Sequence, residues 1–178
     1  MKTNLGRFFL ARIKSPSRKR KGVSLHTAKE VWVVGLIRNM DEQIELHEVM
    51  DRLRGYHGVR EVKLITFAGF TKKTRPEWYV SSREHIAIAK HNLNWKGLPE
   101  EFRKDLSKAQ PELLLDLIKE RSTPLEWVWK MIPAQMKVTT EKSNLSSDSD
   151  LLLTCDKVSS LSEVFAGYEE ILTKYNLK

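Results

Sequence analysis

The chain has one cysteine, Cys155, among its 178 residues. A single cysteine excludes an internal disulfide and a metal cluster built from cysteines alone, and it is typical of a reducing compartment. Cys155 ends the apolar segment 151–155, so we expect a buried, unreactive thiol. No apolar run approaches the ~20 residues that a membrane-spanning helix needs, and we expect a cytoplasmic protein.

Motifs of the commoner nucleotide, zinc and hydrolase folds are absent as well. The sequence contains no G-x-G-x-x-G, G-x-x-x-x-G-K-[ST], H-E-x-x-H, C-x-x-C or G-x-S-x-G. Its five histidines form no metal-binding motif, and we expect surface or structural roles for them. We therefore predict no cofactor and no metal site, and the sequence favours a protein that is not an enzyme.

Positive charge is in excess, and it lies almost entirely in one segment. Residues 1–30 contain nine Lys or Arg and one acidic residue, whereas the whole chain carries 31 basic and 23 acidic side chains. Residues 31–178 are therefore neutral, with 22 of each sign. A basic isoelectric point usually indicates a nucleic-acid or membrane surface. Here the excess of basic residues comes from an N-terminal arm, residues 1–29, which precedes a domain formed by residues 30–178.

The arm combines a helix with a basic hinge. An apolar stripe at helical spacing predicts a short amphipathic helix over residues 4–14. The members of this stripe are Leu5, Phe8, Phe9 and Ile13. Pro16 interrupts the helical pattern, and the segment that follows is typical of a solvated linker. This hinge contains four consecutive cations: Arg18, Lys19, Arg20 and Lys21.

Two interpretations of the arm stay open. In the first, the four cations attract an anionic partner such as RNA, the ribosome or an anionic membrane surface, because a basic cluster binds phosphate groups. In the second, the helix folds back onto the domain and the basic run only keeps the hinge in water. An arm that is rich in arginine and poor in acid also resembles a mitochondrial transit peptide.

Strands and helices alternate along residues 30–178. Apolar runs that do not alternate, such as 30–37 and 112–118, predict strands buried on both faces, as in a parallel sheet. Further strands are predicted at 59–67, 77–80, 85–90, 135–140 and 150–155, and helices at 41–55, 99–109, 123–132 and 160–175. This alternation predicts a three-layer α/β fold with a mostly parallel sheet. The last two strands have no helix between them, which predicts one antiparallel edge pair.

Two capping boxes mark the expected starts of helices. In Thr123-Pro124-Leu125-Glu126, the Thr123 hydroxyl can accept from the Glu126 amide while the Glu126 side chain reaches back to the cap. Ser160 and Glu163 have the same spacing ahead of the last helix. Asn39 or Asp41 is expected to cap the helix at 41–55.

Ligands of open α/β sheets lie beyond the carboxyl ends of the strands. Cations and a helix N-terminus are expected to converge there, which favours an anionic ligand. The candidate ligand-binding residues are Arg38, Asn39, Lys72, Lys73, Asn94, Trp95 and Asp116. The same residues are also compatible with plain solvent exposure, because loops at strand ends face water. Trp95 stands out because a large aromatic is unusual in a turn, although such a ring more often covers the core.

Five short segments, in their order and spacing, resemble a known family. They are 31–37, 92–99, 112–117, 134–138 and 150–153, and they follow a basic arm. With these segments the chain resembles a domain-of-unknown-function family of short bacterial α/β proteins. That family prefers Asn at the position of Asp116 and Gly at the position of Thr139, so a shared site at these positions would be altered here. The resemblance implies the fold and a bacterial, cytoplasmic setting, and it implies no activity.

The function that the sequence favours is binding without catalysis. We expect an α/β binding or adaptor domain whose cationic arm associates with an anionic partner. The alternative is a small-molecule binding protein, or an enzyme, with a site for an anionic ligand at the carboxyl ends of the strands. The sequence leaves the oligomeric state open.

Overall fold

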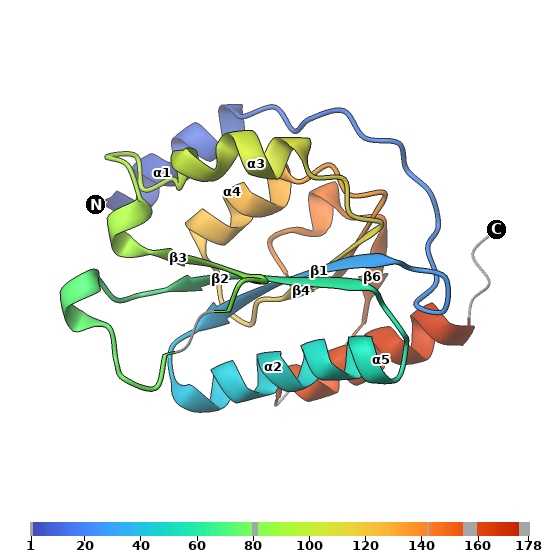
Figure 1. Ribbon diagram of the computed structural model, residues 1–178. Helices are drawn as coiled ribbons and strands as arrows, with labels where there is room; N and C mark the ends of the chain where they lie inside the picture. The colour runs from blue at the N-terminus through green and yellow to red at the C-terminus, as the bar shows by residue number, and fades with distance from the viewer. Residues whose placement is uncertain (1, 80–81, 142, 155–159, 175–178) are drawn as a thin grey trace.

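The computed structural model describes residues 2–79, 82–141, 143–154 and 160–174. Its centre is a six-stranded sheet in the order β3-β2-β1-β4-β5-β6, with helices on both faces (Figure 1). Every pair of neighbouring strands is parallel. The strands are β1 Glu30–Ile37, β2 Glu61–Ala68, β3 His85–Ala89, β4 Leu113–Leu117, β5 Met136–Thr140 and β6 Leu151–Leu153. The predicted α/β fold is thus confirmed.

The predicted antiparallel edge pair is wrong, because β6 lies parallel to β5 with Leu151 opposite Val138. Residues 141–150 carry the chain back to the start of β5, where the Asp150 amide donates to the Lys137 carbonyl (2.9 Å). This connection is close to the ~10–12 residues of the shortest parallel crossovers, and it contains a short 3-10 helix in place of an α-helix. Leu145 anchors it, since this side chain is 5% exposed and packs on the sheet.

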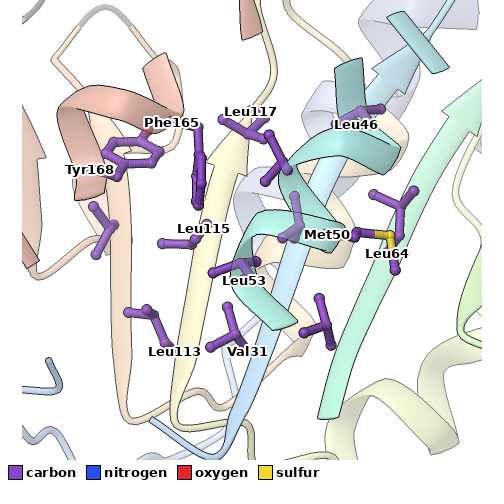
Figure 2. Packing of buried hydrophobic residues seen from close by; sticks show 14 of the residues in the cluster. Val31, Leu46, Met50, Leu53, Leu64, Leu113, Leu115, Leu117, Phe165 and Tyr168 are labelled. Atoms are coloured by element: carbon purple, nitrogen blue, oxygen red, sulfur yellow. The ribbon is translucent and has the colours of Figure 1, made fainter. Parts of the chain in front are cut away.

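Helices α2 Met40–Gly55 and α5 Leu161–Lys174 cover one face of the sheet. Their buried residues recur at helical spacing, which explains why one side of each helix faces the strands. Figure 2 shows Met50 and Leu53 of α2 and Phe165 of α5 packed over strand residues that include Val31 and Leu115. All of these side chains are almost completely buried.

Helices α1 Lys2–Arg12, α3 Arg103–Lys108 and α4 Thr123–Met131 cover the opposite face (Figure 1). Trp32, Val34 and Ile65 are buried on this side of the strands. Four short 3-10 helices lie in the connections, η1 Lys72–Thr74, η2 Lys90–Asn92, η3 Glu100–Phe102 and η4 Ser146–Asp148. Because both faces are covered, β1 and β4 are mostly apolar, as expected for central parallel strands, and Glu30 and Asp116 are their charged residues.

The capping predictions have mixed outcomes. Asn39 caps α2 by accepting from the Glu42 amide (2.9 Å). The Ser160 box is confirmed, with the Glu163 amide donating to the Ser160 hydroxyl at 3.1 Å and the Ser160 amide donating to Glu163 at 3.0 Å. The Thr123 box is wrong, because Ser122 is the N-cap residue and its side chain makes no capping bond. Glu126 accepts from Arg121 (2.9 Å) instead of reaching back to a cap.

Two further segments differ from their predicted structure. Residues 77–79 form a turn rather than an edge strand, and residue 80 lies outside the described residues. The segment 99–109 begins as the 3-10 helix η3 and becomes helical as α3 only from Arg103. Cys155 also lies outside the described residues, so its burial stays a prediction.

Helix α4 is buried on every side. Eight of its nine residues are buried, and Lys130 is the exception. Its polar residues, Thr123, Glu126 and Lys130, share one face, and apolar residues occupy the rest of the circumference, so the helix needs cover beyond its sheet side. Helix α1 lies against it. Leu10 of α1 is 6% exposed, and its carbonyl accepts from the Lys130 ammonium (3.1 Å). The arm helix is therefore packed onto the domain.

The buried face of α1 differs from the predicted stripe. Phe9 and Ile13 pack against the α4 side of the core, as expected. Phe8 is 50% exposed and lies beneath the Arg12 guanidinium, 4.0 Å from its ring centroid. Leu10, which the stripe does not include, is buried, and the Leu5 side chain lies outside the described part of the chain.

In the described part of the chain, no helix has both the length and the apolar composition that crossing a bilayer requires.

Replacing Leu10 with Ala should lower the free energy of unfolding by about 2–5 kcal/mol, because it leaves a cavity between α1 and α4. Urea denaturation of the full chain measures this loss. Phe8→Ala in the same helix is the control, and we expect a loss of no more than about 1 kcal/mol for this half-exposed ring. Equal, small losses for both variants would contradict the docked position of α1.

Candidate functional site

A cavity of about 540 Å³ lies at the carboxyl ends of the strands. Leu36 of β1 and Phe67 of β2 form its floor, and Lys90 follows β3 directly. The walls come from α1, from the turn at residues 94–97 and from the start of α4. In the strand order, β1 has β2 on one side and β4 on the other. The direction of winding changes there, and such a point is where open α/β sheets bind ligands.

Four cationic residues line this cavity, and its described lining contains no acidic residue. The four are Arg7, Lys90, Lys96 and Arg121. Arg121 also donates to the Glu126 carboxylate (2.9 Å), which leaves its other guanidinium N–H groups for a further acceptor. The electrostatic character of the cavity is therefore positive, although residues 31–178 as a whole are neutral.

The N-terminus of α4 adds polar groups of the same character. The first amides of a helix have no acceptor inside it, and they carry a partial positive charge. Ser122 and Thr123 line the cavity at this helix end. Ser122 is 7% exposed, and its buried hydroxyl has no hydrogen-bond partner among the described residues. An unpaired buried hydroxyl costs free energy unless something binds it, so Ser122, a residue of the cavity lining, carries an unused donor and acceptor.

Gly6 allows α1 to approach closely enough to form one wall. A Cβ atom at this position would lie 2.8 Å from the Lys96 carbonyl oxygen and 3.1 Å from the Thr123 methyl group. The facing turn is shaped by Asn94, whose Oδ1 accepts from the amides of Lys96 (2.9 Å) and Leu98 (3.1 Å). Gly97 in this turn has a positive φ of 76°, which few other residues tolerate.

Of the seven predicted ligand-binding residues, all of which the structure describes, Asn94 is the one that lines the cavity. Arg38 and Asn39 act within the fold. The Arg38 Nε donates to Glu42 (2.9 Å), and this pairing raises the pKa of Arg38 above its usual range. Asn39 caps α2. Lys72 and Lys73 lie exposed in η1.

Trp95 and Asp116 have opposite environments. Trp95 is 68% exposed and lies between two residues that line the cavity. Asp116 is 2% exposed at the end of β4. Its carboxylate accepts from the Thr139 hydroxyl (2.5 Å), the Ser143 hydroxyl (2.6 Å) and the Ile118 amide (2.8 Å). Asp116 thus ties the 141–150 connection to the sheet. Any part in ligand binding stays a prediction.

The four predicted arm cations divide into two groups. The Arg18 side chain is 6% exposed. Its guanidinium donates to both Asp150 carboxylate oxygens, at 2.5 and 3.1 Å, and to the Ala134 and Asp148 carbonyls, both at 3.2 Å. Lys19, Arg20 and Lys21 are exposed. Arg18 therefore fixes the hinge to β5 and β6, and the three cations after it face solvent.

The sequence did not single out most of the residues in the cavity. Arg7 belongs to the arm, Lys90 and Lys96 lie in the connection between β3 and η3, and Arg121 lies in the connection before α4. A sequence signal for part of the site is Ser122-Thr123-Pro124, a helix start shortly after the buried strand β4, because it places a helix N-terminus at the carboxyl edge of the sheet. Lys90 and Lys96 also flank the two residues, Asn94 and Trp95, that the sequence had marked.

The strand order and the two helix layers define a Rossmann-like α/β protein. A family model described as "Family of unknown function (DUF6913)" matches residues 4–166. The chain belongs to this family, which confirms the resemblance found in the sequence. No curated protein gives a significant match.

A solved structure with a similar fold is the glycosyl transferase family 9 protein from Veillonella parvula DSM 2008. It has a TM-score of 0.55 and 14% sequence identity, and the match covers 87% of this chain and 44% of that chain. The chain thus spans less than half the length of this structural neighbour, and the similarity shows the fold alone.

Asp116 gives the protein a specific dependence on pH. Burial raises the pKa of Asp116 to about 6, compared with ~3.9 for an unfolded aspartate. Between these values the folded chain holds a proton that the unfolded chain has lost. The stabilisation is therefore complete below about pH 4 and is lost as the pH rises through about 6. The expected loss from this group is about 2–3 kcal/mol.

Urea denaturation between pH 4 and pH 7 measures this effect in the natural chain and in Asp116→Asn. The neutral amide does not titrate, so the variant should lose less stability than the natural chain as the pH rises. Identical slopes for the two proteins would show that Asp116 does not hold its proton in the folded state.

Proposed function

We propose that this chain binds a small phosphorylated ligand in the cavity at the carboxyl ends of β1, β2 and β3. The observation that carries the proposal is the unpaired Ser122 hydroxyl at the N-terminus of α4, in a wall shared with four cations. Helix N-termini and clustered Arg and Lys side chains are the groups that proteins use for phosphate. The volume of about 540 Å³ falls in the range of small-molecule sites, ~300–1,000 Å³.

The proposal is one of binding rather than of catalysis. Asp116, the buried carboxylate nearest in the sheet to the switch point, already accepts from two hydroxyls and an amide. A general base needs a free oxygen within reach of the substrate proton. The structural neighbour is described as a glycosyl transferase. Its fold supports a site at this sheet edge, and the activity is not carried over at 14% identity.

Isothermal titration calorimetry with inorganic pyrophosphate at low salt tests the proposal. Lys90→Ala should weaken binding about fivefold or more, because a charged hydrogen bond is lost. Ser122→Ala should weaken binding while leaving the free energy of unfolding unchanged or slightly higher, since the hydroxyl has no partner to lose. This combination separates a ligand contact from a structural one.

Lys29→Ala is the matched control, because Lys29 is an exposed lysine at the opposite end of β1. It should bind pyrophosphate as the natural chain does. The proposal fails if pyrophosphate does not bind, or if Lys90→Ala and Ser122→Ala bind as tightly as Lys29→Ala.

A second candidate function is capture of an anionic macromolecule by the hinge. It is favoured by the exposure of Lys19, Arg20 and Lys21 in sequence, next to the anchored Arg18. Deleting the arm is not a clean test, because it would also remove α1 from the core. Replacing Lys19, Arg20 and Lys21 with Ala tests the hinge while helix α1 stays packed on the domain.

The triple variant should lose affinity for RNA or for vesicles of anionic lipid, and the affinity of the natural chain should fall steeply with salt. Electrophoretic mobility shift and vesicle co-sedimentation measure the two partners separately. Unchanged binding by the triple variant would exclude the hinge as the contact.

A further inference from the structure

An exposed aromatic ring stands at the rim of the cationic cavity. Trp95 is 68% exposed, and its chain neighbours Asn94 and Lys96 both line the cavity. The ring meets Phe9 of α1 edge to face, with 5.5 Å between centroids. The Lys96 ammonium lies 5.2 Å from the Trp95 centroid and 4.7 Å from the Phe9 centroid. One residue, Lys96, therefore connects the aromatic rim with the charged lining.

The position of Trp95 is fixed rather than incidental. The turn that carries it is held by two hydrogen bonds from backbone amides to Asn94 and by the positive φ of Gly97. Gly6 brings α1 against the same turn. Trp95 is the most exposed of the chain's described tryptophans, and Trp127 and Trp129 are fully buried. An exposed ring carried on an ordered turn is a surface on which a flat ligand group can stack.

On the basis of the proposed function, we propose that the phosphorylated ligand is a nucleotide whose base stacks on Trp95. The phosphate groups occupy the cavity between Lys90, Lys96 and the N-terminus of α4. The base lies outside the cavity against the exposed part of the indole. This arrangement explains both features at once, since a simple phosphate would fill only part of about 540 Å³ and would not use the ring.

A nucleotide fits these features better than a phospholipid headgroup or a sugar phosphate. A base has a flat π surface, and stacking on an aromatic side chain is strong and tolerant of base identity. The cation beside the ring adds to this interaction, because Lys96 can contact a phosphate and remain over the indole. An alkyl chain or a sugar ring offers no such flat partner.

The experiment compares adenosine diphosphate with inorganic pyrophosphate on the full chain by calorimetry. The natural chain should bind adenosine diphosphate about tenfold or more tightly than pyrophosphate, as base stacking predicts. Trp95→Ala should lose this advantage and keep its affinity for pyrophosphate. Trp95→Phe should retain part of the advantage, because it keeps an aromatic face. Tyr56→Ala is the control, since Tyr56 is 85% exposed at the end of α2.

Tryptophan fluorescence gives an independent signal. Adenosine diphosphate should quench the emission of the natural chain and of Tyr56→Ala, and should quench Trp95→Phe much less while still binding to it. If adenosine diphosphate and pyrophosphate bind equally well and Trp95→Ala changes neither, the nucleotide inference is overturned and the phosphate cavity stands. If neither compound binds, both proposals fail.

Discussion

The burial of α4 is the constraint on which the rest of the structure depends. In the helix TPLEWVWKM the three polar residues share one face and apolar side chains cover the rest of the circumference, so packing on the sheet buries only part of its apolar surface. The other sides must be covered by chain from elsewhere. The arm helix α1 and the short helix α3 provide this cover. The hydrophobic effect thus draws two segments into the core that their polar composition would place in solvent.

The same packing creates the candidate site. When α1 covers α4, it brings Gly6 against Lys96 and Thr123 and places Arg7 at the start of α4. The cavity is closed on one side by this helix and on the other by the strand ends. Stability and binding are therefore coupled in one contact. A change that releases α1 would remove a wall and one of the four cations together.

Much of the fold could be predicted from the sequence, because local patterns determine it. Buried parallel strands such as 30–37 and the capping residues Asn39 and Ser160 are recognised from a few neighbouring residues. The direction of β6 could not be read in this way, since it depends on whether residues 141–150 can return across the sheet. The residues of the site are harder to predict from the sequence than the fold is. Of its predicted residues Asn94 lines the cavity, whereas Arg7 and Arg121 meet there only through the long-range docking of α1.

The excess positive charge of the arm is best understood as three separate contributions. Arg7 belongs to the cavity, and Arg18 is enclosed with Asp150 and backbone carbonyls. Lys19, Arg20 and Lys21 form an exposed cationic surface, in which Arg20 also pairs with Asp150 (3.4 Å). Salt screens exposed charges strongly and enclosed pairs weakly. Rising ionic strength should therefore weaken any contact made through the hinge and leave the Arg18 anchor in place. The isoelectric point of the chain reports only the sum of these charges. The structure assigns them to three places: the Arg18 contact, the cavity and the exposed part of the hinge.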